Sequence, residues 1–132
     1  LAERYGTPSS LLYFDLDDFK TVNDAHGHAA GDSVLRHFSN LLQSQIRETD
    51  ILARLGGDEF GIILVHVTLA TALKKAASLT QALRRHPPMV QGQPVSLSFS
   101  HGAYELRAGE DADLAMALAD QAMYAQKKRS GR

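Results

Sequence analysis

The pair of glycines at positions 56 and 57 is the feature that most constrains how this chain can fold. It separates two short apolar runs, at residues 51–55 and 60–65. Such runs around two glycines predict an antiparallel hairpin, because glycine accepts a positive φ in a tight turn without strain. Two acids, Asp58 and Glu59, follow at once. They form either an ordinary exposed turn or a site for a hard cation, which prefers oxygen ligands.

A second acidic cluster, Asp15 to Asp18, follows an apolar and aromatic segment at 10–14 that predicts a buried strand. If this strand lies beside the hairpin, Asp15 and the hairpin acids face one point. Acids from two elements can there hold Mg²⁺, which keeps few protein ligands and shares substrate phosphates. We expect Asp17 and Asp18 to cap a short helix at 19–23. Lys20 lies within reach of a phosphate as a point charge.

Helical periodicity begins at Asp32, after a loop of Gly, His and Ala residues that ends at Gly31. Thr68 predicts the cap of a further helix, which the prolines at 87 and 88 end. Its predicted inner face comprises Leu69, Leu73, Ala76, Thr80 and Leu83. A turn at 91–94, a strand at 95–104 and a loop at 106–110 follow. A last helix is expected from Asp111 or Asp113 to about Lys128.

The order of these elements is strand, helices, strand, strand, helix, strand, helix. This alternation around a hairpin predicts a two-layer α/β sandwich with a mixed or antiparallel sheet. Residues 1–132 suit one domain with a single core. The abrupt start and end of the sequence lead us to expect a domain cut from a longer polypeptide.

Composition narrows the classes of function. Fourteen basic against fifteen acidic residues argue against a dedicated binder of nucleic acid or membrane surfaces, which needs a basic excess. The absence of cysteine excludes disulfides and thiolate metal sites and fits a reducing compartment. No apolar run approaches the roughly 20 residues that span a bilayer.

One polar pair suits recognition of a base. Asn23 and Asp32 flank the Gly/His/Ala loop. A neighbouring amide and carboxylate can read a purine edge, because the carboxylate accepts from the amino and ring N–H groups of guanine.

These residues together resemble the GGDEF family of diguanylate cyclases. The resemblance rests on three blocks in order, at Asp15 to Asp24, Gly27 to Asp32 and Gly56 to Phe60. It implies the fold of adenylyl cyclases and the polymerase palm, with a ferredoxin-like core. It also implies Mg²⁺-dependent condensation of two GTP into cyclic di-GMP and two pyrophosphates, with Mn²⁺ as a possible substitute. Each domain would bind one GTP, so catalysis would need a homodimer.

The resemblance assigns roles by matching position. The positions that match the metal site are Asp15, Leu16 through its carbonyl, Asp58 and Glu59. Asp58 and Glu59 are also the catalytic acids, and Asp58 would help to deprotonate the 3′-hydroxyl. The positions that match substrate binding are Lys20 for phosphate, Asn23 and Asp32 for guanine, and His28.

A further match is the Arg-x-x-Asp spacing of Arg47 and Asp50, which resembles the family's inhibitory site for product cyclic di-GMP. Arginine's fork suits a phosphate or a guanine edge, and the carboxylate suits guanine N–H groups. The alternative is an arginine at a helix end beside an aspartate that starts a turn.

Two positions depart from the family pattern. His101 stands where the family has an apolar residue, so it needs a partner or a more exposed strand. Near its C-terminus the family has a Lys and, four residues later, an Arg that together bind phosphate as a clamp. Here this pair matches Lys127 or Lys128 with Arg132, because one residue is inserted relative to the family pattern. We expect a cytoplasmic cyclase, or the cytoplasmic domain of a membrane-anchored protein, linked to an N-terminal sensory domain. The alternatives are a catalytically silent module that binds GTP or cyclic di-GMP and a scaffold that only dimerises.

Overall fold

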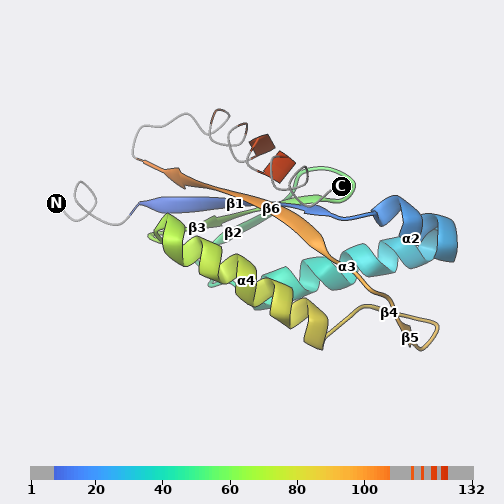
Figure 1. Ribbon diagram of the computed structural model, residues 1–132. Helices are drawn as coiled ribbons and strands as arrows, with labels where there is room; N and C mark the ends of the chain where they lie inside the picture. The colour runs from blue at the N-terminus through green and yellow to red at the C-terminus, as the bar shows by residue number, and fades with distance from the viewer. Residues whose placement is uncertain (1–7, 108–113, 115–116, 118–119, 122, 125–132) are drawn as a thin grey trace.

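Four antiparallel strands form the central sheet of the protein, in the order β2-β3-β1-β6 (Figure 1). The computed structural model describes residues 8–107 together with residues 114, 117, 120, 121, 123 and 124. The strands of the sheet are β1 (Ser9–Leu16), β2 (Ile51–Arg54), β3 (Glu59–Leu64) and β6 (Phe99–Leu106). This order, with helices after β1 and after β3, is a split βαβ arrangement of the ferredoxin-like type. The predicted two-layer α/β fold is therefore confirmed.

Three helices are described in full: α2 (Phe19–His26), α3 (His28–Ser44) and α4 (Leu69–Arg85). Helices α3 and α4 lie on one face of the sheet (Figure 1). The prediction that the α3 helix begins at Asp32 after a loop is wrong, because it begins at His28. Gly27 has φ 90°, a conformation that suits glycine, and it separates two helices with no loop between them.

The main core lies between the sheet and these helices. Leu12, Phe14 and Leu16 of β1 point into it, because alternate residues of a strand face the same side. Phe14 packs edge to face against Phe99, with ring centroids 5.1 Å apart. Phe38 of α3 packs in the same way against Phe60 of β3, also at 5.1 Å. The opposite face of β1 carries a smaller buried cluster of Leu11, Tyr13 and Met123.

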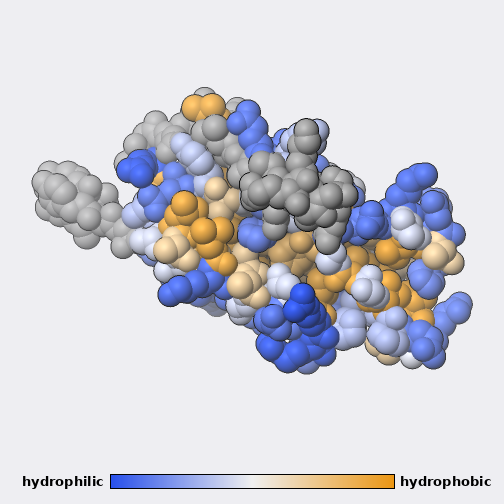
Figure 2. All heavy atoms as spheres, in the orientation of Figure 1, coloured by the Kyte–Doolittle hydropathy of each residue, from blue (hydrophilic) through white to orange (hydrophobic). Residues whose placement is uncertain are grey.

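The cap of α4 is confirmed, but its buried face is shifted. The Thr71 N–H donates to Thr68 Oγ1 at 3.3 Å, and the helix ends at Arg85 before the prolines. Leu73, predicted inside, is exposed. The buried residues are Ala72, Ala76, Leu79, Ala82 and Leu83. Three of these positions are alanines, whose small side chains let the helix approach the sheet closely. Figure 2 shows apolar patches along the helical layer on an otherwise largely hydrophilic face.

The last strand of the sheet is shorter at its start than predicted. Residues 95–98 precede β6 outside the strand, and a small hairpin of β4 (Met89–Val90) and β5 (Gln93–Pro94) lies before them. Its turn uses Gln91 at φ 51° and Gly92 at φ 78°, so the turn predicted at 91–94 is confirmed for its first two residues, while the last two form β5. The predicted last helix falls largely outside the described residues, although those described between 114 and 124 are helical. None of the described helices has the length and apolarity to cross a membrane.

His101 lies half-buried on β6, opposite Phe14 and with its ring centroid 6.3 Å from that of Phe99. Burial lowers the pKa of His101 below its ordinary value of 6.5. The unfolded chain, whose histidine keeps the ordinary pKa, therefore binds a proton first as the pH falls through 6.5. The contribution of His101 to stability is full above that pH and is lost between 6.5 and the lower folded pKa.

We expect the substitution His101→Ile to remove this loss. Between about pH 8 and pH 5.5, the wild-type protein should lose more free energy of unfolding than the variant does. Urea denaturation at the two pH values measures the difference. His26→Gln, which removes an exposed histidine at the end of α2, should follow the wild type. An equal pH dependence for wild type and His101→Ile would contradict the assignment.

Candidate active site

Pairing of β1 with β3 brings the two acidic clusters together. Asp15 lies directly opposite Glu59 in the antiparallel register. The Leu16 N–H donates to the Asp58 carbonyl at 3.0 Å, so the chain beyond Asp15 is held against the hairpin. The prediction that acids from the first strand and the hairpin meet is confirmed for Asp15 and Glu59 by this register.

Asp17 fixes the end of β1 on the side that faces β6. Its buried carboxylate accepts from Ser98 Oγ at 2.8 Å and from Ser100 Oγ at 2.7 Å. The Asp17 N–H donates to the Ser98 carbonyl at 2.9 Å. The expectation that Asp17 and Asp18 cap α2 with their side chains is wrong. Asp18 occupies the N-cap position with φ 54° but makes no side-chain cap bond. Asp17 ties the end of β1 to the segment that enters β6.

The hairpin turn is present, but for a different reason from the one predicted. Among the described glycines only Gly27 and Gly92 have positive φ, so the turn at Gly56 and Gly57 does not use that conformation. The Leu55 and Gly56 N–H groups both donate to the Glu59 carbonyl, at 2.8 and 3.3 Å. A Cβ on Gly56 would come within 2.7 Å of Glu59 Oε1. Glycine at 56 therefore leaves room for the Glu59 side chain.

Arg54 supports this turn, and sequence reasoning missed it. Its Nε donates to the Gly56 carbonyl at 3.1 Å and its Nη2 to the Gly57 carbonyl at 2.6 Å. The guanidinium holds the backbone directly before Asp58. The available signal was a basic residue at the end of a strand, close to carbonyls that a tight turn leaves without partners.

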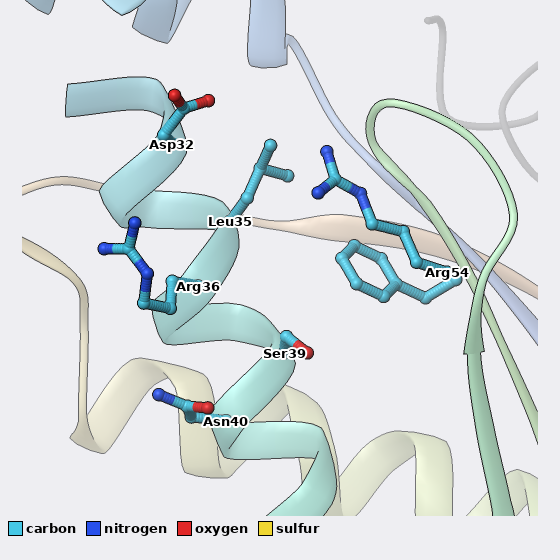
Figure 3. A pocket seen from close by; sticks show the side chains of 7 residues that line it. Asp32, Leu35, Arg36, Ser39, Asn40 and Arg54 are labelled. Carbon is cyan, nitrogen blue, oxygen red and sulfur yellow. The ribbon is translucent and has the colours of Figure 1, made fainter. Parts of the chain in front are cut away.

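A cavity of about 430 Å³ lies between α3 and the hairpin. Its lining includes Asp32, Arg36 and Ser39 of α3, and Arg54 and Phe60 of the hairpin strands. In Figure 3, the Asp32 carboxylate and the Arg54 guanidinium lie on opposite sides of the cavity, with Leu35 between them. Its size is that of small-molecule sites in proteins, and it carries charges of both signs.

The predicted base-reading pair is brought close by contact between α2 and α3. The Asn23 side chain lies against Gly31, and a Cβ at position 31 would overlap Asn23 Oδ1. Gly31 is buried and precedes Asp32 directly. The close approach of the two helices thus depends on glycine at 31, and it places the Asn23 amide beside the residue that precedes Asp32.

The other predicted substrate residues lie at the surface of these two helices. Lys20 is on α2, and its side chain, 91% exposed, is 3.9 Å from Asp24 in an ion pair. Such exposed pairs are weak, so the lysine can turn to another anion. His28 is exposed at the first residue of α3. The predicted clamp of Lys127 or Lys128 with Arg132 lies outside the described residues.

The acids fit a divalent cation by their chemistry. Like charges directly opposite in an antiparallel pair repel, and a cation between Asp15 and Glu59 would offset this repulsion. Within the described part of the chain, no three His, Cys, Asp or Glu side chains converge as a metal site. Mg²⁺ does not need three, because it keeps waters and takes oxygens from substrate phosphates. Asp15, Glu59 and the neighbouring Asp58 are the residues whose oxygens would hold such a cation.

Arg47 and Asp50 are in contact with one another. The Asp50 side chain, 1% exposed, accepts from Arg47 Nη2 at 2.8 Å and from the Arg47 N–H at 2.9 Å. It also accepts from the Val65 N–H at 3.1 Å, and Arg47 Nη2 donates to the Val65 carbonyl at 2.6 Å. Burial alone would raise the pKa of Asp50, but the hydrogen bonds from Arg47 and Val65 outweigh it and lower that pKa. Asp50 therefore joins the turn before β2 to the end of β3, and the half-exposed Arg47 is the accessible member.

Comparison with known proteins places this chain in a family. The model of the diguanylate cyclase GGDEF domain matches residues 1–132. Diguanylate cyclase DosC from Escherichia coli (strain K12) is 35% identical over 129 residues, which cover 97% of this chain and 28% of DosC. The chain thus spans under a third of the length of that relative.

Two solved structures are similar over almost the whole chain. The GGDEF domain of TpbB (YfiN) from Pseudomonas aeruginosa has a TM-score of 0.86 and 36% identity, covering 99% of this chain and 82% of that one. The GGDEF domain of DgcB from Caulobacter crescentus, solved in complex with c-di-GMP, has a TM-score of 0.86 and 29% identity, covering 99% and 78%. With the family model matched from end to end, this chain belongs to the diguanylate cyclase GGDEF domain family.

Proposed function

We propose that this chain is a catalytic domain that condenses two GTP molecules into cyclic di-GMP and two pyrophosphates. The observation that carries the proposal is the register of β1 and β3, which sets Asp15 opposite Glu59 with Asp58 adjacent. Family membership supports the reaction class. Acids held on paired strands are fixed more firmly than acids on a free loop, which suits a reaction whose geometry must be preset.

The acids have separate tasks in this proposal. Asp15 and Glu59, with the Leu16 carbonyl, would hold the Mg²⁺ or Mn²⁺ that binds with GTP. The bound cation supplies positive charge that lowers the pKa of the attacking 3′-hydroxyl and offsets the charge that develops on the α-phosphate. Asp58, in the turn that Arg54 holds, also binds the metal and accepts the 3′-hydroxyl proton.

The helices supply the remaining contacts with GTP. Asn23 and Asp32 read the guanine edge, supported by the close contact of Asn23 with Gly31. Lys20 exchanges its weak ion pair with Asp24 for a phosphate oxygen. His28, exposed at the start of α3, borders the same ligand. Each domain carries one such set, so two domains must face each other for each 3′-hydroxyl to attack the other GTP.

A module that binds GTP or cyclic di-GMP without catalysis is the second candidate. The complex of the DgcB domain with c-di-GMP is the observation that favours it, because ligand binding by such a domain does not require turnover. The two candidates differ in one respect. A cyclase forms cyclic di-GMP at a rate that depends on Asp58, whereas a binding module forms none.

We expect the substitution Asp58→Asn to reduce turnover by at least about 100-fold. It keeps the shape of the side chain but removes a negative metal ligand and the proton acceptor. The measurement is the initial rate of cyclic di-GMP formation from GTP and Mg²⁺, in a fusion that holds two domains together as a dimer.

Glu48→Gln is the matched control, because it removes one negative charge from an exposed residue. Its initial rate should equal that of the wild type. A dimeric Asp58→Asn protein with nearly normal turnover would contradict the assignment of Asp58 as a metal ligand and proton acceptor.

Base choice tests the Asn23 and Asp32 assignment. Adenine presents its donors and acceptors in the opposite order, so it leaves these groups without partners. GTP should bind at least about tenfold more tightly than ATP, because a hydrogen bond to a charged group contributes about 1.5–3 kcal/mol. Asp32→Ala should remove most of this preference. Calorimetry with both nucleotides measures it, and equal affinity of the wild type for ATP and GTP would rule the assignment out.

We also propose product feedback through Arg47, with Asp50 orienting its guanidinium. Arg47 remains 57% exposed while it contacts Asp50, so it can meet a phosphate or guanine edge of cyclic di-GMP. The site lies at the start of β2, which leads to the hairpin acids. Product bound there restrains two domains from facing each other, provided that it binds the unproductive arrangement more tightly.

Arg47→Ala should therefore weaken product inhibition while leaving the initial rate intact. Progress curves with added cyclic di-GMP measure the effect. Arg85→Ala, at the exposed end of α4, is the control and should be inhibited like the wild type. Inhibition of Arg47→Ala and wild type at the same product concentration would refute a regulatory role for this site.

Asp50→Ala should behave differently from Arg47→Ala. It leaves the backbone N–H groups of Arg47 and Val65 without their acceptor, and a buried donor left without a partner costs roughly 1–3 kcal/mol. Chemical denaturation should thus show a larger loss of stability for Asp50→Ala than for Arg47→Ala. The reverse order would mean that Asp50 does not hold the turn before β2 to β3.

A further inference from the structure

Tyr13 lies near Glu59 on the sheet face that α3 and α4 do not cover. It is a β1 residue, paired with Gly61, and it lies on the same side of the sheet as Asp15 and Glu59. Glu59 is therefore its diagonal neighbour on β3, within reach of a long aromatic side chain. The register therefore places the Tyr13 hydroxyl where it can donate a hydrogen bond to the Glu59 side chain.

The tyrosine ring is fixed by packing. Tyr13 is 8% exposed and lies in a buried cluster with Leu11 and Met123, which Ile63 and Tyr104 border. A ring held on several sides has few alternative rotamers, so its hydroxyl has a defined position. Glu59 is confined from the other side, since its Oε1 would lie only 2.7 Å from a Cβ on Gly56.

A tyrosine hydroxyl is a hydrogen-bond donor, and an ionised carboxylate is only an acceptor. A hydrogen bond to an ionised acceptor is shorter and stronger than one between neutral groups, so it orients the carboxylate effectively.

We propose that Tyr13 is a positioning residue, which orients the Glu59 carboxylate so that it faces the cation site shared with Asp15. The role rests on the proposed cyclase function. Groups that hydrogen-bond to a metal-ligating carboxylate fix its direction, and their loss commonly reduces metal affinity 10- to 100-fold. Tyr13 touches neither substrate nor reacting atoms, and it acts through Glu59 alone.

The test is the affinity for Mn²⁺ in the presence of saturating guanosine 5′-(α,β-methylene)triphosphate, measured by calorimetry. Tyr13→Phe keeps the ring and removes only the hydroxyl. It should raise the Kd for Mn²⁺ about tenfold or more. Tyr104→Phe removes a hydroxyl from a residue beside the same cluster and should leave the Kd unchanged. The melting temperature of each variant shows whether the fold is retained.

Two further measurements separate positioning from a general effect on structure. In a Glu59→Gln background, Tyr13→Phe should cause no further loss of Mn²⁺ affinity, because the group that it orients has gone. The carboxyl ¹³C resonance of Glu59, assigned by its absence in Glu59→Gln, should shift in Tyr13→Phe and not in Tyr104→Phe. Equal losses of affinity in both backgrounds, or an unshifted resonance, would overturn the proposal even if Tyr13→Phe is less stable.

The outcomes also distinguish this role from the function on which it rests. A wild-type protein that binds Mn²⁺ and forms cyclic di-GMP, with Tyr13→Phe unchanged in both, overturns only the positioning role. A wild-type protein that neither binds Mn²⁺ with the nucleotide nor forms product contradicts the cyclase function, and the positioning role fails with it.

Discussion

The antiparallel pairing of β1 with β3 is the constraint on which the rest of the site depends. Alternate β1 residues face the core, so Phe14 packs against Phe99 while Asp15 points to the other side. A slip of one residue would exchange these faces and bury a carboxylate among aromatic rings, at a large cost in free energy. Packing of the core therefore sets the register, and the register sets Asp15 opposite Glu59.

Polar side-chain interactions then hold the segments around the acids. Asp17 joins the end of β1 to the segment that enters β6 through two serine hydroxyls. Asp50 joins the turn before β2 to the end of β3, and Arg54 holds the hairpin turn itself. The hydrogen bonds of Asp17 and Asp50 satisfy carboxylates that would otherwise be buried without partners, so the loss of either destabilises the fold as well as the site.

Sequence reasoning found what local pattern determines and missed what depends on distant neighbours. The Thr68 cap was predictable, because a cap needs only its own helix. Asp17 was not, since its acceptor role depends on serines more than 80 residues away. The roles of Arg54 and Tyr13 depend on carbonyls and a carboxylate that only the folded hairpin presents. The start of α3 was misplaced because Gly27 lets two helices follow directly.

The central claim is that the paired acids of β1 and β3 form a catalytic site. The most direct measurement is to incubate the purified wild-type domain, held as a dimer, with GTP and Mg²⁺ and to separate the products by chromatography. Our account predicts cyclic di-GMP and pyrophosphate in a ratio of one to two, with no product when the metal is chelated. Binding of GTP without any cyclic di-GMP, in a dimer that is folded and loaded with Mg²⁺, would contradict the account.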